Sequence, residues 1–237
     1  MIQIEGVESS EVLLQRLADE KKPVILNFSR GKDSLATWIA LQDHGIEVIP
    51  IHKACPPGLK FVNDSIDMYE QHFQTHIINL PSYGFYRMLR NKVYQPPERC
   101  SIIEGLDIPA VDRDEFDVFM RTQFAAGDDT TWIVDGVRAA DSATRRMAFK
   151  MYGAVKDARR RMSPIWDYQK KDVMALLDRE KVKLPAEYDW IGRSFDALRH
   201  DSLVHIAKHA PDDYAVIKYW FPLIDADLSR GALFYGN

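Results

Sequence analysis

Hydrophobic positions along the chain alternate between short continuous runs and helical spacing. Continuous apolar runs indicate buried strands, and apolar residues that recur every three or four positions indicate helices. The expected strands are 24–28, 46–51, 75–80 and 130–135. The expected helices are 11–19, 35–44, 60–73, a short one around 83–88, 114–124, 167–181, 201–209 and 212–220. Strands that alternate with helices predict an α/β fold, a doubly wound and mostly parallel sheet with helices on both faces.

The length of 237 residues suits one full α/β domain with a small addition. We expect this domain to span residues 1–200, followed by a helical C-terminal extension over 201–237. Residues 81–129 have a less regular pattern, and we expect them to be an insertion or lid between strands. In open parallel sheets, ligands bind outside the carboxyl ends of the strands. The segments that follow the expected strands are therefore the first places to look for chemistry.

Composition narrows the class of protein. Hydrophobic residues make up 46% of the chain, charged residues 28%, and the net charge is −4, which is typical of a soluble globular protein without a global attraction to nucleic acid. No apolar run has the length of a membrane span, and no signal peptide is evident, so a cytoplasmic location is expected. The two cysteines, Cys55 and Cys100, are too few for a disulfide framework or a four-thiolate site, so no iron–sulfur cluster is expected.

The polar turn after the first expected strand carries anion-binding chemistry. It stands between the apolar run 24–28 and the helical pattern that begins with Leu35. Backbone N–H groups at a helix N-terminus are unpaired and lie at the positive end of the macrodipole, so they stabilise an anion. The residues of the turn are Ser29, Arg30, Gly31, Lys32, Asp33 and Ser34. The serines and the lysine add side-chain donors, and the turn predicts a phosphate ester as ligand.

A second segment of this kind follows the fourth expected strand at Gly136. Arg138, Ser142 and Arg145 are spaced by four and three residues, so they share one face if the segment is helical. Guanidinium groups bind anion oxygens in pairs, and this face suits a phosphate or sulfate group. The alternative is a solvated basic surface. We expect the two segments to converge on one polyanionic ligand.

Both segments resemble motifs of a known group of proteins. The turn at 29–34 resembles the SGGxDS signature of the PP-loop superfamily, the adenine nucleotide alpha hydrolases, although Arg30 stands where that signature has glycine. It does not match the GxxxxGK[ST] P-loop. The order strand, glycine and Arg-x-x-x-Ser-x-x-Arg resembles the PAPS (phosphoadenylyl-sulfate) reductase family. Two weaker matches, at 52–62 and 163–173, extend the resemblance over about residues 20–200, and in the second of them Asp167 is expected to cap the following helix.

The resemblance implies a set of site residues. Those that would bind the nucleotide are Ser29, Arg30, Gly31, Lys32, Asp33, Ser34, His52, Gly136, Arg138, Ser142 and Arg145. Lys32, Asp33, Arg138 and Arg145 would be catalytic, and Asp33 would contact a metal ion. Asp141 would orient an arginine. The implied cofactors are ATP, or PAPS or adenylyl sulfate, with Mg²⁺. His52 occupies a position where the family has an aspartate, and it is either a ligand donor or an ordinary residue at a strand end.

Three functions remain open at this stage. The first is an enzyme of the ATP pyrophosphatase or adenylyl-transfer type, in which an unknown acceptor attacks the α-phosphorus of ATP and releases pyrophosphate. The second is a sulfonucleotide-binding or transfer enzyme. The reductases carry a cysteine in a C-terminal E-C-G-x-H segment, and this chain has no cysteine after Cys100, so their reductive route is not expected. The third is a non-catalytic nucleotide-binding subunit.

Partners other than an adenine nucleotide and the acceptor are less defined. The basic cluster at 159–161 is either a contact for nucleic acid or an ion-pair network on the surface. Cys55, beside Lys53, is either a thiolate nucleophile or a buried apolar residue. The aromatic residues around 214–221 pack inward or form a dimer contact, so a protein partner or a homodimer is a further expectation. No membrane contact is expected.

Overall fold

The structure is a computed structural model that describes residues 1–229. The chain divides into two compact units. Unit 1 comprises Met1–His52, His76–Ile78 and Asp114–Leu184, and unit 2 comprises Lys53–Thr75, Asn79–Arg113 and the chain from Pro185. Of the helices described, none combines the length and apolar character needed to cross a membrane. Each unit is treated by itself below.

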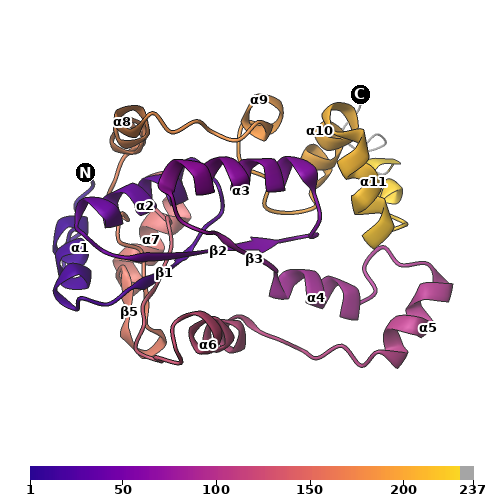
Figure 1. Ribbon diagram of the computed structural model, residues 1–237, viewed down its shortest axis with the longest axis horizontal. Coiled ribbons are helices and arrows are strands. Elements are labelled where there is room, and N and C mark those ends of the chain that lie inside the picture. The colour runs from indigo at the N-terminus through magenta and orange to yellow at the C-terminus, as the bar shows by residue number, and fades with distance from the viewer. Residues whose placement is uncertain (230–237) are drawn as a thin grey trace. The chain divides into compact units, whose positions relative to one another are not determined.

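Unit 1 carries most of the sheet (Figure 1). Its helices are α1 (Ser10–Asp19), α2 (Lys32–Asp43), α6 (Arg113–Phe124), α7 (Ala143–Tyr152) and α8 (Lys170–Glu180), with short 3₁₀ turns η1 (Ala139–Asp141) and η2 (Asp157–Arg159). Its strands are β1 (Val24–Asn27), β2 (Val48–Ala54), which runs on into unit 2, β4 (Ile133–Val134), β5 (Val155–Lys156) and β6 (Arg161–Met162).

Unit 2 is mainly helical. Its helices are α3 (Lys60–Phe73), α4 (Tyr83–Arg90), α5 (Pro97–Gly105), α9 (Glu187–Ile191), α10 (His200–His209) and α11 (Pro211–Trp220). The strand β3 (Ile78–Pro81) begins at the boundary between the units. Helices α10 and α11 match the two helices predicted near the C-terminus. The predicted division at residue 200 is not tested by these units and stays a prediction.

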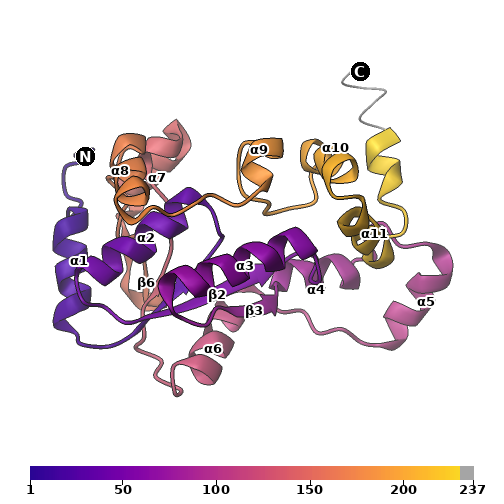
Figure 2. The ribbon, with the colours of Figure 1, turned by 45° about the horizontal axis from the view of Figure 1, so that its top comes forward.

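The sheet has six strands in the order β3-β2-β1-β4-β6-β5. β1 pairs in parallel with β2 and β4, β4 pairs in parallel with β6, and β5 is antiparallel to β6. Within unit 1, both ribbon views place α2 and α8 on one side of β1 and α6 on the other (Figures 1 and 2). The predicted α/β fold, a mostly parallel sheet covered on both faces, is confirmed.

The sequence of β1 explains its central place. Val24, Ile25 and Leu26 are at most 2% exposed, because helices cover both faces of a parallel sheet and successive side chains point to opposite faces. Ile25 lies opposite Ile133 of β4 and Ile49 of β2. The continuous apolar run is thus the pattern that a strand buried on both sides requires.

β1 is also the point where the order of strand addition reverses. β2 and β3 extend from one side of β1, and β4, β6 and β5 extend from the other. In open α/β sheets, the crevice for a ligand lies outside the carboxyl ends of the strands at such a switch point. Here those ends are followed by the turn at Ser29 and by Gly136.

Several predicted elements differ in detail. The strand expected over 130–135 is reduced to Ile133–Val134. The helix expected from residue 167 begins at Lys170, because Gln169 has an extended backbone and forms a capping box with Asp172. Asp167 does not cap that helix, since its Oδ2 accepts a hydrogen bond from the backbone N–H of Ser10 in α1 at 3.1 Å. Helices α5, α7 and α9 and strands β5 and β6 were not predicted.

Residues 81–129, expected to be one insertion or lid, do not belong to one body. They contain α4, α5 and α6, and the boundary between the two units falls after Arg113. The residues up to Arg113 belong to unit 2 and those from Asp114 to unit 1. A role for this stretch as a lid stays a prediction.

A carboxylate from α11 starts helix α3 within unit 2. Leu59, at the N-cap of α3, offers no side-chain acceptor, and the backbone N–H groups of Lys60 and Phe61 donate instead to Asp213, the second at 3.2 Å. Asp213 is only 5% exposed. We expect Asp213→Ala to lower the free energy of unfolding by about 1–2 kcal/mol, the value of an N-cap, as measured by urea denaturation. Asp212→Ala is the control, since Asp212 makes no such bond, and an equal effect in both variants would contradict this role.

Candidate functional site

The turn at Ser29–Ser34 is held by its own hydroxyl groups. Ser34 Oγ donates to the carbonyl of Gly31 at 2.9 Å, Ser29 Oγ lies 3.1 Å from Ser34 Oγ, and the N–H of Gly31 donates to Ser29 Oγ at 3.4 Å. α2 begins immediately afterwards, and its first backbone bond runs from Leu35 N–H to Gly31. The N–H groups at the start of α2 thus precede the helical ladder, as an anion site requires.

Gly136 packs directly against the start of α2. A Cβ atom at Gly136 would lie 2.7 Å from the carbonyl carbon and oxygen of Asp33 and 2.9 Å from the nitrogen of Ser34. These distances are below van der Waals contact, and the atoms met are backbone, so only glycine fits. The end of β4 and the turn after β1, which are about a hundred residues apart in sequence, therefore meet as predicted.

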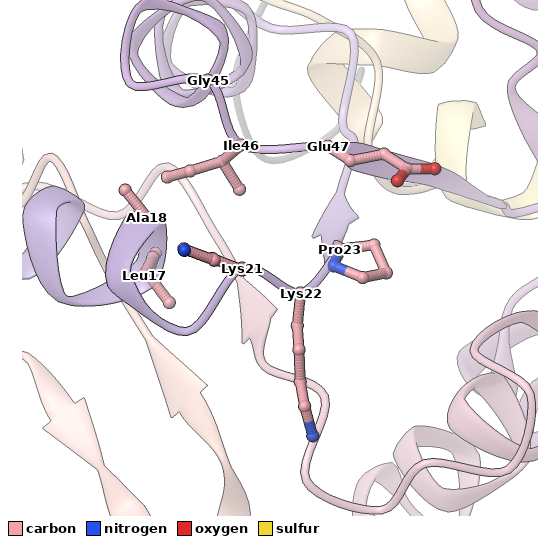
Figure 3. A pocket seen from close by; sticks show the side chains of 8 residues that line it. All are labelled: Leu17, Ala18, Lys21, Lys22, Pro23, Gly45, Ile46 and Glu47. Atoms are coloured by element: carbon pink, nitrogen blue, oxygen red, sulfur yellow. The ribbon is translucent and has the colours of Figure 1, made fainter.

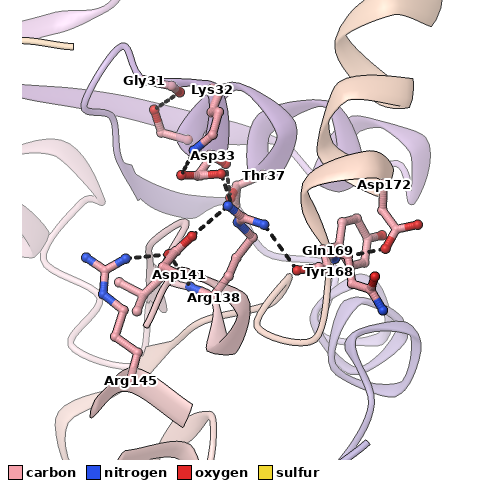
Figure 4. Close-up of polar contacts among 12 residues, drawn as sticks. Gly31, Lys32, Asp33, Thr37, Arg138, Asp141, Arg145, Tyr168, Gln169 and Asp172 are labelled. Carbon is pink, nitrogen blue, oxygen red and sulfur yellow. Dashed lines mark hydrogen bonds and ion pairs between the residues drawn. The ribbon is translucent and has the colours of Figure 1, made fainter. Parts of the chain in front are cut away.

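Arg138 joins the two segments by charge (Figure 4). Its Nε lies 2.8 Å from Asp33 Oδ1, its Nη2 donates to Asp141 Oδ1 at 2.6 Å, and its Nη1 donates to the carbonyl of Tyr168 at 3.2 Å. The Arg138 side chain is only 3% exposed. This buried guanidinium therefore links the turn after β1 to the segment after β4. Its donor groups are directed into the protein and not toward solvent.

Two further cations end this chain of charges. Lys32 Nζ lies 2.8 Å from Asp33 Oδ2, and Arg145 pairs with Asp141 Oδ2. Cations and carboxylates alternate in this row of ion pairs, called the charge chain below, and its net charge is +1. Its members, in order of contact, are Lys32, Asp33, Arg138, Asp141 and Arg145. Among the three cations, Lys32 is 25% and Arg145 49% exposed, whereas Arg138 is 3% exposed. An incoming anion would therefore meet Lys32 and Arg145 before Arg138.

The expectation that Arg138, Ser142 and Arg145 share one helical face is wrong. Arg138 precedes η1, and Ser142 has an extended backbone, with φ −164°. Ser142 is the N-cap of α7, and its Oγ accepts a hydrogen bond from the N–H of Arg145 at 3.1 Å. A serine whose side chain caps a helix interrupts the preceding turn, so the two arginines are connected through Asp141 instead. The carbonyl of Tyr168 has no signal in the sequence that would have identified it.

His52 and Arg30 are both buried. His52 is 5% exposed, and its Nδ1 lies 3.0 Å from the carbonyl of Phe28, so the ring ties the end of β1 to β2. Arg30 is fully buried and has a φ of 63°, in the left-handed region that favours glycine and costs other residues about 1 kcal/mol. The backbone at residue 30 thus adopts a positive φ, which glycine adopts more easily than any other residue. Nucleotide contacts from either side chain stay a prediction.

The residues around Asp33 do not fit a divalent cation. Oδ1 of Asp33 faces Arg138, and Oδ2 faces Lys32. Over residues 1–229, the structure brings together no group of three or more His, Cys, Asp or Glu residues that would hold a metal ion. A carboxylate already paired with two cations is a poor ligand for Mg²⁺, which needs several free oxygens.

The basic cluster at 159–161 forms ion pairs with acidic side chains. Arg159 lies 3.2 Å from Asp114, Arg160 lies 2.9 Å from Glu20, and Arg161 lies 2.7 Å from Asp117. Of the two alternatives, the geometry therefore favours the ion-pair network. Contact with nucleic acid at this cluster receives no support from the geometry.

Cys55 lacks the environment of a nucleophile. Burial raises the pKa of its thiol above the usual value, and a hydrogen bond involving Ser82 offsets this only in part. Its Sγ lies 3.9 Å from the sulfur of Met88. A thiol with a raised pKa is protonated at neutral pH. Lys53 was expected to lower this pKa, but the effect of burial is the largest. Cys55 thus behaves as a small buried residue.

A hollow of about 250 Å³ lies at the opposite ends of the strands (Figure 3). It is lined by the end of α1, the turn Lys21–Pro23 before β1, and the loop Gly45–Glu47 before β2. Lys22 lines the hollow, but its ammonium group points away from it and lies 2.9 Å from Asp128. The hollow is at the amino ends of β1 and β2, where parallel sheets do not place their ligands. It is therefore not the site that the turn and the arginines form.

The phenol of Tyr168, the residue whose carbonyl contacts Arg138, makes the stability of the fold depend on pH. Burial, with a smaller contribution from Asp167, raises the pKa of its phenol to about 12. The folded state therefore holds this proton more tightly than the unfolded chain, whose tyrosine pKa is about 10. This contribution to stability is complete below pH 10 and is lost between pH 10 and 12. We expect Tyr168→Phe to reduce the loss of unfolding free energy between pH 9 and 11.5, measured by urea denaturation, and an unchanged loss would contradict the assignment.

Comparison with known proteins gives limited guidance. No protein-family model matches the chain, and no curated protein matches it. Among solved structures, it is similar to the U34-tRNA thiolase NcsA from Methanococcus maripaludis with its [4Fe-4S] cluster. The identity is 15%, the TM-score is 0.45, and the match covers 91% of this chain and 79% of that chain. The cluster in that structure contradicts the expectation that this chain holds no iron–sulfur cluster, and that prediction is withdrawn; neither ATP nor Mg²⁺ is named with that structure.

Proposed function

We propose that this chain is an enzyme of the PP-loop superfamily that binds an adenine nucleotide outside the carboxyl ends of β1 and β4. One observation carries the proposal: the two segments that resemble the superfamily's motifs meet, through the contact of Gly136 with Asp33 and the ion pair of Arg138 with Asp33 at 2.8 Å. A chance resemblance in two separate segments would not require them to lie together.

In the proposed reaction, an oxygen of an acceptor attacks the α-phosphorus of ATP, a new P–O bond forms, and pyrophosphate leaves. The N–H groups at the start of α2 and the ammonium group of Lys32 would bind the departing phosphates. Arg145, which is half exposed, would bind a further anionic part of the nucleotide. Catalysis would rest on positioning and on charge stabilisation, since no described group near the turn stands out as a general base.

In this proposal Arg138 would position other residues, in place of the phosphate contact expected from the sequence. Its guanidinium is directed at two carboxylates and a carbonyl, so it would act by holding the turn and the start of α7 in register. Asp33 and Asp141 would orient Lys32 and Arg145 respectively. These are positioning roles, and the phosphates would be contacted by the two end members of the charge chain.

A sulfonucleotide such as PAPS or adenylyl sulfate is the second candidate. The observation that favours it is Arg145, an exposed cation at the start of α7 and well separated in sequence from Lys32, which suits a ligand with two anionic groups. Isothermal titration calorimetry with ATP, PAPS and adenylyl sulfate distinguishes the two. Lys32→Ala is the control that assigns the heat to this turn.

Pyrophosphate release from ATP then tests the chemistry. We expect ATP to bind more tightly than either sulfonucleotide and pyrophosphate to accumulate when the acceptor is supplied. Binding without release under every acceptor condition would leave a nucleotide-binding subunit. Absence of binding to all three nucleotides would refute the proposed function.

A further inference from the structure

The loop formed by Trp166, Asp167 and Tyr168, called the 166–168 loop below, makes two contacts with the arginine segment of the site. The N–H of Ala139 donates to the carbonyl of Trp166 at 2.7 Å, and Nη1 of Arg138 donates to the carbonyl of Tyr168 at 3.2 Å. Both acceptors are backbone groups. The 166–168 loop therefore supplies one of the contacts that position the Arg138 guanidinium, beside those with Asp33 and Asp141.

The other side of the same loop is fastened to the N-terminal segment. The N–H of Ile2 donates to the carbonyl of Asp167 at 2.7 Å, and the indole N–H of Trp166 donates to the carbonyl of Glu8 at 2.8 Å. The N–H of Ser10, at the start of α1, donates to Asp167 Oδ2 at 3.1 Å. Three hydrogen bonds thus bind the loop to residues 2–10.

Burial makes this arrangement rigid. Trp166 is 1% exposed, Asp167 2% and Ser10 0%, and the Trp166 ring packs against Phe149 of α7 at 5.4 Å between ring centres. Hydrogen bonds inside a protein are stronger than in water and expensive to leave unmade, so the loop has no alternative position without losing them. Movement of the N-terminal segment would be transmitted to the loop and then to Arg138.

We infer that Trp166 and Asp167 are positioning residues for the anion site, which hold Arg138 in place by fastening the 166–168 loop to residues 2–10. The inference rests on the proposed function for its effect on nucleotide affinity. Its structural part, the placement of the Arg138 guanidinium, is independent of what the site binds.

Trp166→Phe and Trp132→Phe form a matched pair of variants. Both tryptophans are 1% exposed in unit 1, and each donates its indole N–H at 2.8 Å, Trp166 to Glu8 and Trp132 to Glu20. Each substitution removes one hydrogen bond and keeps an aromatic ring. Only the first of them touches the 166–168 loop. Asp167→Ala, which removes the acceptor for Ser10, is the second test variant.

The direct readout is the Nε–H signal of Arg138 in protein labelled with ¹⁵N-arginine, assigned by its loss in Arg138→Lys. In the unaltered protein we expect a distinct signal that exchanges slowly with water, because the Arg138 side chain is only 3% exposed. Trp166→Phe and Asp167→Ala should shift this signal and accelerate its exchange. Trp132→Phe should leave it unchanged.

The second readout is affinity for ATP by calorimetry, well below the melting temperature of each variant. We expect Trp166→Phe and Asp167→Ala to weaken binding about fivefold, the scale of one lost hydrogen bond, and Trp132→Phe to leave it within about twofold. An Arg138 signal that is the same in all variants overturns the inference. If the unaltered protein does not bind ATP, the proposed function fails, and the NMR result still decides the role of the loop.

Discussion

Gly136→Ala is expected to disrupt both the fold around the site and nucleotide binding. The added methyl group would lie 2.7 Å from the backbone of Asp33 and 2.9 Å from the nitrogen of Ser34, and backbone of a buried helix start has little room to move. We expect the free energy of unfolding to fall by about 1–3 kcal/mol, the usual cost of overpacking. Affinity for ATP should fall at least about tenfold, since the N–H groups that would bind phosphate shift with the backbone.

Gly105→Ala provides the matched control. Gly105 ends α5, and a Cβ there would have no atom within 4 Å. We expect this variant to change the unfolding free energy by less than about 1 kcal/mol and to leave ATP binding unaltered. Gly136→Ala with full stability and full affinity would show that the two segments do not meet as described.

Arg138→Ala is expected to have the largest effect on stability of any substitution in the charge chain. It leaves Asp33 and Asp141, which are 25% and 16% exposed, facing one another without the cation between them. Removing one partner of a buried ion pair costs about 3–5 kcal/mol. The measurement is urea denaturation followed by circular dichroism, with Arg138→Lys as a milder variant that retains the charge but loses the three separate nitrogens of the guanidinium.

Arg145→Ala should separate binding from stability. Its side chain is 49% exposed and shares a single carboxylate, so its removal should cost less than about 1 kcal/mol of stability. Affinity for ATP should nevertheless fall by about 1–3 kcal/mol if Arg145 contacts an anionic group of the ligand. If Arg145→Ala destabilises the protein as much as Arg138→Ala, the proposed division of roles is wrong, in which Arg138 stabilises the structure and Arg145 binds the ligand.

The central elements of the fold are predictable from sequence because their signals are local. The run Val24–Phe28 is apolar at every position but Asn27, since β1 is buried on both faces, and α2 follows with apolar residues at helical spacing. α5 was missed because none of its residues is buried, and α7 because only Phe149 is. Such helices leave no periodic apolar stripe. β5 and β6, of two residues each, exist only through pairing with each other and with β4.

The site was predictable to the level of segments. The polar turn and Gly136 each follow an apolar strand, and the rule for parallel sheets brings strand ends to one edge. The geometry within the site was not predictable, because it depends on long-range partners. The burial of Arg138 is set by Asp33, about a hundred residues earlier, and by the carbonyl of Tyr168, which any residue would provide. Ser142 was assigned to a helical face by spacing alone, although serine favours the N-cap.

The burial of α2 determines how the turn recognises a ligand. Eight consecutive residues of this helix, from Ser34 to Leu41, are buried, and α2 packs along α8. A helix enclosed on so many sides does not slide or tilt without opening voids, so its amides stand in one fixed orientation before any ligand arrives. Association with the proposed ligand would then lose little conformational entropy in the backbone, and selectivity among anions would depend on the reach of Lys32 and Arg145.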